Sequence, residues 1–382
     1  MKRVLFISVL ILGLVATPAS AQLGKLGQAV GKISKAKSMA DQIKDFVITE
    51  QEEKDMGAAI STRLRQKYGV VQDAAVHKYV SLVGRVVASS STRPNLTWTF
   101  IVLDTDGVNA FAAPGGFVHI TRGALALIAN EAELAGVLGH EITHITEKHT
   151  INAIKKSKVA GGAVEAATRS NVLEFMLDRA YANLLENQYD RGDENESDQV
   201  GIRMANKVGY APAGLGAFLT RLSDRNKDLK EPSGVFASHP ETKDRVNKLA
   251  KQITSEKLNA TATVAARYKA TISYKPVAVT VVAGAAGASS LTGSSGSATT
   301  TTAKPATTTS STAKPPASSS KFGLGGVTSK LGADKTNTGT VASAGSRGVN
   351  PDRDAKGGPN PARVTVTLTP AEIAAFRKGI SG

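Results

Sequence analysis

Apolar side chains recur at helical spacing in several stretches of the chain, and helix-start signals precede some of them. Thr49 and Glu52 form a capping box before a run in which Met56, Ile60 and Leu64 share one face. This combination predicts a helix that buries that face against a core. The same periodicity predicts further helices over residues 76–87, 172–187, 215–222 and 246–253.

One predicted helix contains the most informative run in the chain, HEITH. Asn130 and Glu133 form a capping box that starts this helix, and apolar residues recur through the run. Residues i and i+4 of a helix lie one above the other, so His140 and His144 can hold one ion, with Glu141 turned about 100° further round. This layout is typical of a zinc metallopeptidase; a solvated helix end that binds nothing is the alternative.

Two glycines, Gly136 and Gly139, interrupt the same helix. A glycine inside a helix costs about 1 kcal/mol relative to alanine. We therefore expect both to serve close packing or access to the metal.

A third metal ligand is expected elsewhere, because catalytic zinc usually has three protein ligands and one open position. Glu194 and Asp198 are an i, i+4 pair on a second predicted helix that continues to Gly209. Glu194 can ligate the ion while Asp198 accepts a hydrogen bond from the outer nitrogen of a ligating histidine. An acidic first turn that complements the helix dipole is the alternative. His149 is rotated well off the ligand face, and we expect it at the surface.

Four blocks, in order, resemble the gluzincin family of CAAX prenyl proteases, HtpX and the periplasmic BepA-like proteases. They are residues 109–116 with the following 118–123, the HEITH helix, residues 194–198, and Ser238-His239-Pro240 with Arg245. The resemblance covers roughly residues 45–255. It implies a zincin-like core in which one zinc ion is held by His140, His144 and Glu194, with Glu141 as the general base.

Two short stretches, residues 97–103 and 117–121, are rich in β-branched and aromatic side chains and predict strands. Pro114-Gly115-Gly116 is the turn before the second. The family resemblance implies that a strand here pairs with an extended substrate peptide, which gives affinity with little sequence preference. An ordinary buried hairpin is the alternative, and the residues can serve both roles. The candidate substrate-binding residues are Asn109, Ala110, Phe111, Ala112, Gly115 and Gly116.

His239 and Arg245 are further candidate catalytic residues. The resemblance directs both toward the cleft, where they would stabilise the oxyanion of a tetrahedral intermediate. For His239, filling the fourth zinc position in a latent state is a second interpretation. Because Pro240 and a predicted helix follow, a capping or packing role for His239 is equally compatible with the sequence.

The start of the chain predicts export. Lys2 and Arg3, the apolar residues 4–16 and Ala19-Ser20-Ala21 are typical of a cleaved signal peptide over residues 1–21. The apolar run is too short to span a bilayer, and no other stretch is long enough; a retained signal anchor is the alternative. Cysteine is absent, which excludes disulfides and a lipid-modified amino-terminal cysteine. We expect a periplasmic or secreted protein.

Composition predicts the remaining organisation. Residues 285–360 are dominated by Ser, Thr, Ala, Gly and Pro, so they cannot bury enough apolar surface to offset their ordering entropy, and we expect disorder. The expected segments before this tail are a basic segment at 22–44, the metallopeptidase domain at 45–258 and a strand or linker at 259–284.

A short element is expected at the carboxy terminus, residues 361–382. Residues 363–368 alternate like a strand, and Thr369 with Glu372 caps a short helix. The element is either an ordered stub or a docking peptide.

The chain has 47 basic and 32 acidic residues, a formal net charge of +15. Basic surfaces attract nucleic acid, anionic lipid or acidic envelope polymers. For an exported protein we expect no nucleic-acid partner, and weak association with the envelope or a membrane surface; added solubility is the alternative. No feature of the sequence indicates an oligomeric state.

The sequence therefore predicts an α+β fold, with a mostly helical zincin-like core, a small β-sheet and a disordered tail. The predicted function is a zinc endopeptidase that cleaves unfolded or extended substrates among exported, misfolded or mis-assembled envelope proteins. The alternative is a chaperone or assembly factor that keeps this fold with latent or little activity. A zinc-buffering or structural metal protein is a third interpretation, which an open coordination position would oppose.

Overall fold

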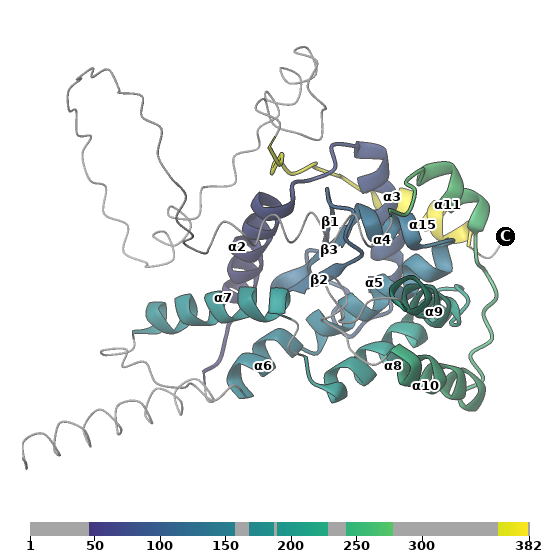
Figure 1. Cartoon of the computed structure of the whole chain (residues 1–382). Helices are drawn as coiled ribbons and strands as arrows, with labels where there is room; N and C mark the ends of the chain where they lie inside the picture. Colours follow the sequence, from purple (N-terminus) through teal and green to yellow (C-terminus); the bar gives the residue numbers. More distant parts are fainter. Residues whose placement is uncertain (1–45, 157–167, 187–188, 228–241, 278–357, 381–382) are drawn as a thin grey trace, which may run out of the picture. The chain divides into compact units, whose positions relative to one another are not determined.

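Helices pack against a small sheet in the computed structural model of the chain (Figure 1). The chain divides into two units. Nearly all the described residues belong to the unit that residues 48–156 and residues 169–382 form together. The structure describes residues 46–156, 168–186, 189–227, 242–277 and 358–380. The predicted signal peptide, the basic segment 22–44, most of the predicted disordered tail and His239 lie outside these ranges.

The predicted α+β fold is confirmed. The helices of the described residues are α2 (Glu50–Tyr68), α3 (Ala74–Ala88), α4 (Arg122–Leu127), α5 (Glu131–Thr146), α6 (His149–Lys156), α7 (Arg169–Glu186), α8 (Arg191–Lys207), α9 (Gly214–Asn226), α10 (Thr242–Ser255), α11 (Ala265–Thr271) and α15 (Pro370–Lys378). Each helix predicted from periodicity is present. The structure adds α4, α6 and α11, the last lying in the segment where a strand or linker was expected.

The sheet has three strands in the order β1-β3-β2. Strand β1 (Thr99–Leu103) runs parallel to β3 (Phe117–Thr121), and β2 (Ala110–Ala113) runs antiparallel to β3. A 3₁₀ turn (Pro114–Gly116) joins β2 to β3, and Gly115 and Gly116 have φ angles of 72° and 98°, which favour glycine. Both predicted strands are confirmed, and β2 lies at an edge of the sheet.

Polar side chains cap α2 and α5, two helices for which the sequence predicted a capping box. Thr49 accepts from the backbone of Glu52, whose carboxylate accepts from the Thr49 N–H at 2.9 Å, so this capping box is complete. At α5, Asn130 accepts from the backbone of Glu133 at 3.0 Å. The Glu133 carboxylate accepts from the side-chain amide of Asn130 at 3.1 Å and from the N–H of Ala129, but not from the backbone N–H of Asn130, so the second predicted box forms only in part.

Helix α5 is the centre of the fold, and all its residues are buried. It contacts α3, α8, α9 and β2. Gly136 allows α9 to approach, because a Cβ at this position would lie 2.8 Å from Leu215. Gly139 plays the same part toward α8, so both glycines serve close packing.

The carboxy-terminal segment packs on the same unit as the core. Phe376 of α15 contacts the ring of Tyr79 edge-on, and the guanidinium of Arg267 lies 3.9 Å over the Phe376 ring. Upstream, the carbonyl of Asn360 accepts from the N–H of Val70 at 2.7 Å. The strand expected at residues 363–368 was wrong: this stretch forms no strand. Among the described residues, no helix combines the length and apolarity needed to cross a membrane.

Candidate active site

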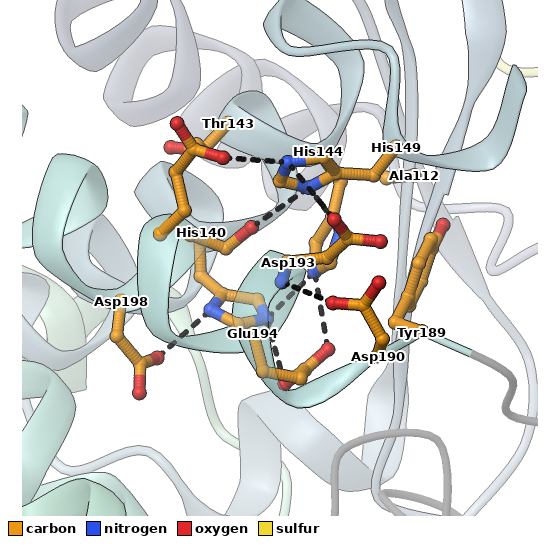
Figure 2. A network of polar contacts seen from close by, with 12 residues as sticks. Ala112, His140, Thr143, His144, His149, Tyr189, Asp190, Asp193, Glu194 and Asp198 are labelled. Carbon is orange, nitrogen blue, oxygen red and sulfur yellow. Dashed lines mark hydrogen bonds and ion pairs between the residues drawn. The ribbon is translucent and has the colours of Figure 1, made fainter. Parts of the chain in front are cut away.

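Helix α5 places its two histidines on one face, as the i, i+4 spacing predicts. The Nε2 atoms of His140 and His144 are 3.0 Å apart, and both side chains are buried (Figure 2). Glu141 follows His140 and is 1% exposed. Burial raises the pKa of Tyr189, and the nearby Glu141 carboxylate adds to this shift. The Glu141 carboxylate is therefore close enough to Tyr189 to act on it electrostatically.

Helix α8 brings Glu194 to the two histidines. Its carboxylate oxygens lie 3.6 Å from His140 Nε2 and 3.4 Å from His144 Nε2. One atom from each of the three residues can be chosen so that all lie within 4.8 Å of one another. Ligands about 2.0–2.2 Å from a tetrahedral zinc are about 3.3–3.6 Å apart. The three side chains fit zinc once the two imidazoles separate by a few tenths of an ångström.

Asp198 fixes the orientation of His140. The Nδ1–H of His140 donates to Asp198 Oδ1 at 2.9 Å, which leaves the lone pair of Nε2 facing Glu194 and His144 (Figure 2). Burial opposes a charged imidazole, but the Glu194 and Asp198 carboxylates outweigh it and raise the pKa of His140. The Glu194 and Asp198 carboxylates therefore stabilise positive charge at His140, as a cation site requires.

Arg245 of α10 is buried against the two carboxylates of α8. Its Nε and Nη2 donate to Asp198 at 2.8 and 2.7 Å, and Nη1 lies 3.2 Å from Glu194 Oε2. Burial favours the neutral acid, yet Arg245 and His140 lower the pKa of Asp198 to about 2. The guanidinium thus faces Asp198 and Glu194, and its predicted contact with an oxyanion stays a prediction. The predicted role of His239 lies outside the described residues.

His149 is buried, so its expected surface position was wrong. The prediction extended the helix of the HEITH run through His149, but α5 ends at Thr146. Lys148 then adopts a φ of 58°, and a new helix begins at His149. This turn brings the His149 ring back toward α5. The Nδ1 atom of His149 lies 3.0 Å from Nδ1 of His144.

Tyr189 and Thr150 also join the site, and no pattern in the sequence indicated a role for either. The Tyr189 ring stacks on His144 with centroids 4.0 Å apart. Its hydroxyl lies 2.8 Å from the hydroxyl of Thr150, which donates to the carbonyl of Ala112 at 3.4 Å. These contacts connect the histidine cluster to β2.

The predicted substrate residues lie beside this cluster. Ala110, Phe111 and Ala112 belong to β2, and Asn109 precedes them, its side chain accepting from the N–H of Ala110 at 2.9 Å. The N–H of Gly115 donates to the Glu53 carboxylate at 3.1 Å. A narrow cleft is lined by side chains of both regions, among them Ala112, Pro114, His144 and Thr150. β2 therefore lies next to His144.

Two histidines four apart on a buried helix, a glutamate beside them and a carboxylate from a second helix are the arrangement of a metallopeptidase of the HExxH type. Residues 74–253 match the model of peptidase family M48. The chain therefore carries a peptidase family M48 domain, and the resemblance seen in the sequence is confirmed.

Three curated relatives illustrate the similarity. The beta-barrel assembly-enhancing protease of Escherichia coli K12 is 24% identical over 206 residues, which are 51% of this chain and 42% of that protein. The mitochondrial metalloendopeptidase OMA1 of Schizosaccharomyces pombe is 27% identical over 45% of this chain and 51% of its own length. The metalloprotease YcaL of E. coli K12 is 29% identical, over 40% of this chain and 61% of its own. The similarity thus spans about half of this chain and about half of each relative.

Proposed function

We propose that the chain is a zinc-dependent endopeptidase. The observation that carries the proposal is the convergence of His140, His144 and Glu194, whose candidate donor atoms lie within 4.8 Å of one another. The match to peptidase family M48 supports the same reaction class.

The proposed roles follow from position. His140, His144 and Glu194 would hold the ion, and Asp198 and Arg245 would keep the first histidine and the carboxylate in place. When bound, zinc supplies Lewis-acid chemistry, since it polarises a carbonyl and lowers the pKa of water. Glu141 accepts a proton from the attacking water and passes it to the amine of the leaving product.

The substrate we propose is an unfolded or extended protein segment that pairs with β2. This strand is at the edge of the three-stranded sheet and has β3 as its partner. Backbone pairing selects an extended conformation more than a sequence. Ala110 and Ala112 are small, which suits a strand that another chain must approach closely.

We place this activity in the cell envelope. The predicted signal peptide supports export, and a relative named for enhancing β-barrel assembly supports a role among envelope proteins. Misfolded or mis-assembled proteins of the periplasm are then the substrates we propose. Weak association with a membrane or envelope surface remains a proposal based on the net charge of +15.

Cleavage of an unfolded model protein, such as casein, tests the reaction. The wild-type chain should cleave it, a chelator should stop cleavage and added zinc should restore it. Glu141→Gln should bind zinc but not cleave, whereas Glu174→Gln, at an exposed position of α7, should cleave normally. Cleavage by Glu141→Gln at the wild-type rate would contradict the proposed mechanism.

A chaperone or assembly factor with a latent site is the second candidate function. The observation in its favour is the burial of the cluster: His140, Glu141, His144 and Glu194 are each 3% exposed or less. The stacked Tyr189 ring covers His144. Suppression of aggregation that survives a chelator, without cleavage, would favour this candidate. Mass spectrometry of envelope proteins from cells with wild-type or Glu141→Gln protein would then identify cleaved substrates, which only the endopeptidase predicts.

A further inference from the structure

A line of polar side chains extends from His144 away from the proposed metal position. His144 Nδ1 lies 3.0 Å from His149 Nδ1, and His149 Nε2 lies 3.2 Å from Glu196 Oε2. His149 is 2% exposed and the Glu196 side chain is 52% exposed. The line therefore leads from the buried cluster to the surface through one histidine, which the proposed reaction does not use.

Hydrogen-bond chemistry assigns the protons along this line. A neutral imidazole has one donor nitrogen and one acceptor nitrogen. A carboxylate only accepts, so Nε2 of His149 carries the proton and Nδ1 of His149 accepts. The donor to that acceptor is then Nδ1–H of His144, which leaves Nε2 of His144 with the lone pair facing Glu194 and His140.

We infer that His149 is a positioning residue for metal binding: it accepts from His144 and so fixes the tautomer that turns Nε2 toward the ion, while Glu196 fixes His149. The inference rests on the proposed function, since it presupposes an ion held by His140, His144 and Glu194. The outer partner of a ligating histidine is usually a carboxylate, a backbone carbonyl or water. Here Asp198 serves His140 in that way, and His149 takes the equivalent place for His144.

The neighbours of His149 are consistent with this assignment. The Ser197 hydroxyl lies 3.3 Å from His149 Nδ1, farther than His144 does, so His144 is the better-placed donor. Asp193 Oδ1 lies 3.9 Å from His149 Nε2, on the side where Glu196 already accepts. Both acidic groups favour a proton on Nε2.

Zinc affinity of the whole chain, measured by competition with a chromophoric chelator, tests the role. His149→Phe keeps a ring of similar size but removes the acceptor, and we expect the zinc dissociation constant to rise about 10–100-fold, the usual effect of losing such a partner. His149→Asn offers a carbonyl oxygen close to the Nδ1 position and should restore most of the affinity. A packing role alone would not be restored by the smaller, polar residue. Zinc affinity of His149→Phe equal to that of wild type would overturn the inference.

A second measurement does not depend on whether a variant folds. The ¹⁵N NMR spectrum of the zinc-loaded wild-type chain should show His144 protonated at Nδ1 and His149 at Nε2. A proton on Nδ1 of His149 would overturn the inference. Failure of the proposed function is distinct from either result, because the wild-type chain would then bind no zinc at this cluster.

Discussion

A Cβ atom on Gly201 of α8 would lie 2.8 Å from the backbone nitrogen of His140 in α5, so the two helices meet here backbone to backbone. Gly139 faces the same point, and a Cβ on it would lie 2.8 Å from the carbonyl oxygen of Gly201. This close approach lets Asp198 and Glu194 of α8 reach the His140 ring. The geometry of the proposed metal site thus depends on two residues without side chains.

Gly201→Ala should therefore disturb both stability and the site. The added methyl meets backbone atoms that cannot rotate away, and overpacking of this kind costs about 1–3 kcal/mol. Urea denaturation should show this loss, and a zinc titration should show weaker binding. Gly216→Ala is the matched control, because nothing lies within 4 Å of its Cβ position in α9; it should be neutral or slightly stabilising. Equal behaviour of the two variants would refute the packing account.

Removal of the metal should lower thermal stability. An ion that binds only the folded state adds about 2.7 kcal/mol to the free energy of unfolding at a concentration 100-fold above its dissociation constant. Thermal melts with zinc or with a chelator measure the difference. Glu194→Gln removes a ligand charge and should show little response to zinc, while Glu174→Gln should respond as wild type does. A full zinc response in Glu194→Gln would argue against Glu194 as a ligand.

Because His119 is buried, we predict that the folded protein loses stability in mild acid. Burial, together with the nearby charge of Arg65, lowers its pKa from 6.5 to about 3. Between these values the unfolded chain binds a proton that the folded chain does not, so stability is complete above about pH 6.5 and falls toward pH 3. The slope for one such group is about 1.4 kcal/mol per pH unit.

His119→Gln isolates this contribution. Urea denaturation of the zinc-free protein at pH 7.5 and pH 5.5 should show that the variant loses less stability on acidification than wild type does. His77, whose pKa burial also lowers, remains in both proteins and supplies the shared part of the acid response. The same loss in both proteins would exclude His119 as a source.

Arg267 links the start of α5 to the carboxy-terminal helix. Its guanidinium donates to Glu131, a fully buried carboxylate that also accepts from Tyr79 and Tyr210 at 2.8 and 2.9 Å. The same guanidinium lies over the ring of Phe376. Arg267→Met should cost about 1.5–3 kcal/mol, because it removes hydrogen bonds to a charged group.

Hydrogen exchange distinguishes this effect from a general loss of stability. Amides of α15 should exchange faster in Arg267→Met than in wild type. Arg203→Met, which removes a more exposed pair with Glu256, is the control and should cost less than about 1 kcal/mol. Unchanged exchange in α15 would show that Arg267 does not hold this helix.

The sequence predicted the helices and the central cluster because both depend on local spacing. Thr49 and Thr369 start their helices with the polar partners found three residues later. The pair Glu194 and Asp198 lies on one face of α8 for the same reason that His140 and His144 do on α5. Local spacing therefore identified each pair, and the need for a third zinc ligand, together with the family resemblance, joined the two pairs into one site.

The wrong predictions concern segments whose structure does not follow from the local residue pattern. His149 was expected at the surface because the helix was extended across Lys148. No residue pattern predicted the positive φ angle of Lys148. In residues 363–368 the alternation is real, since Val364 and Val366 are half-buried and Thr365 is exposed, but no neighbouring strand pairs with it. Strand formation needs a partner, and that partner cannot be deduced from the pattern of one segment.

The zinc content of the purified chain tests the central claim most directly. Mass spectrometric metal analysis should find about one zinc per wild-type chain and per Glu141→Gln chain, and almost none in His144→Ala or Glu194→Ala. Wild-type protein without zinc after incubation with the metal, or Glu194→Ala with a full complement of zinc, would contradict the proposed site.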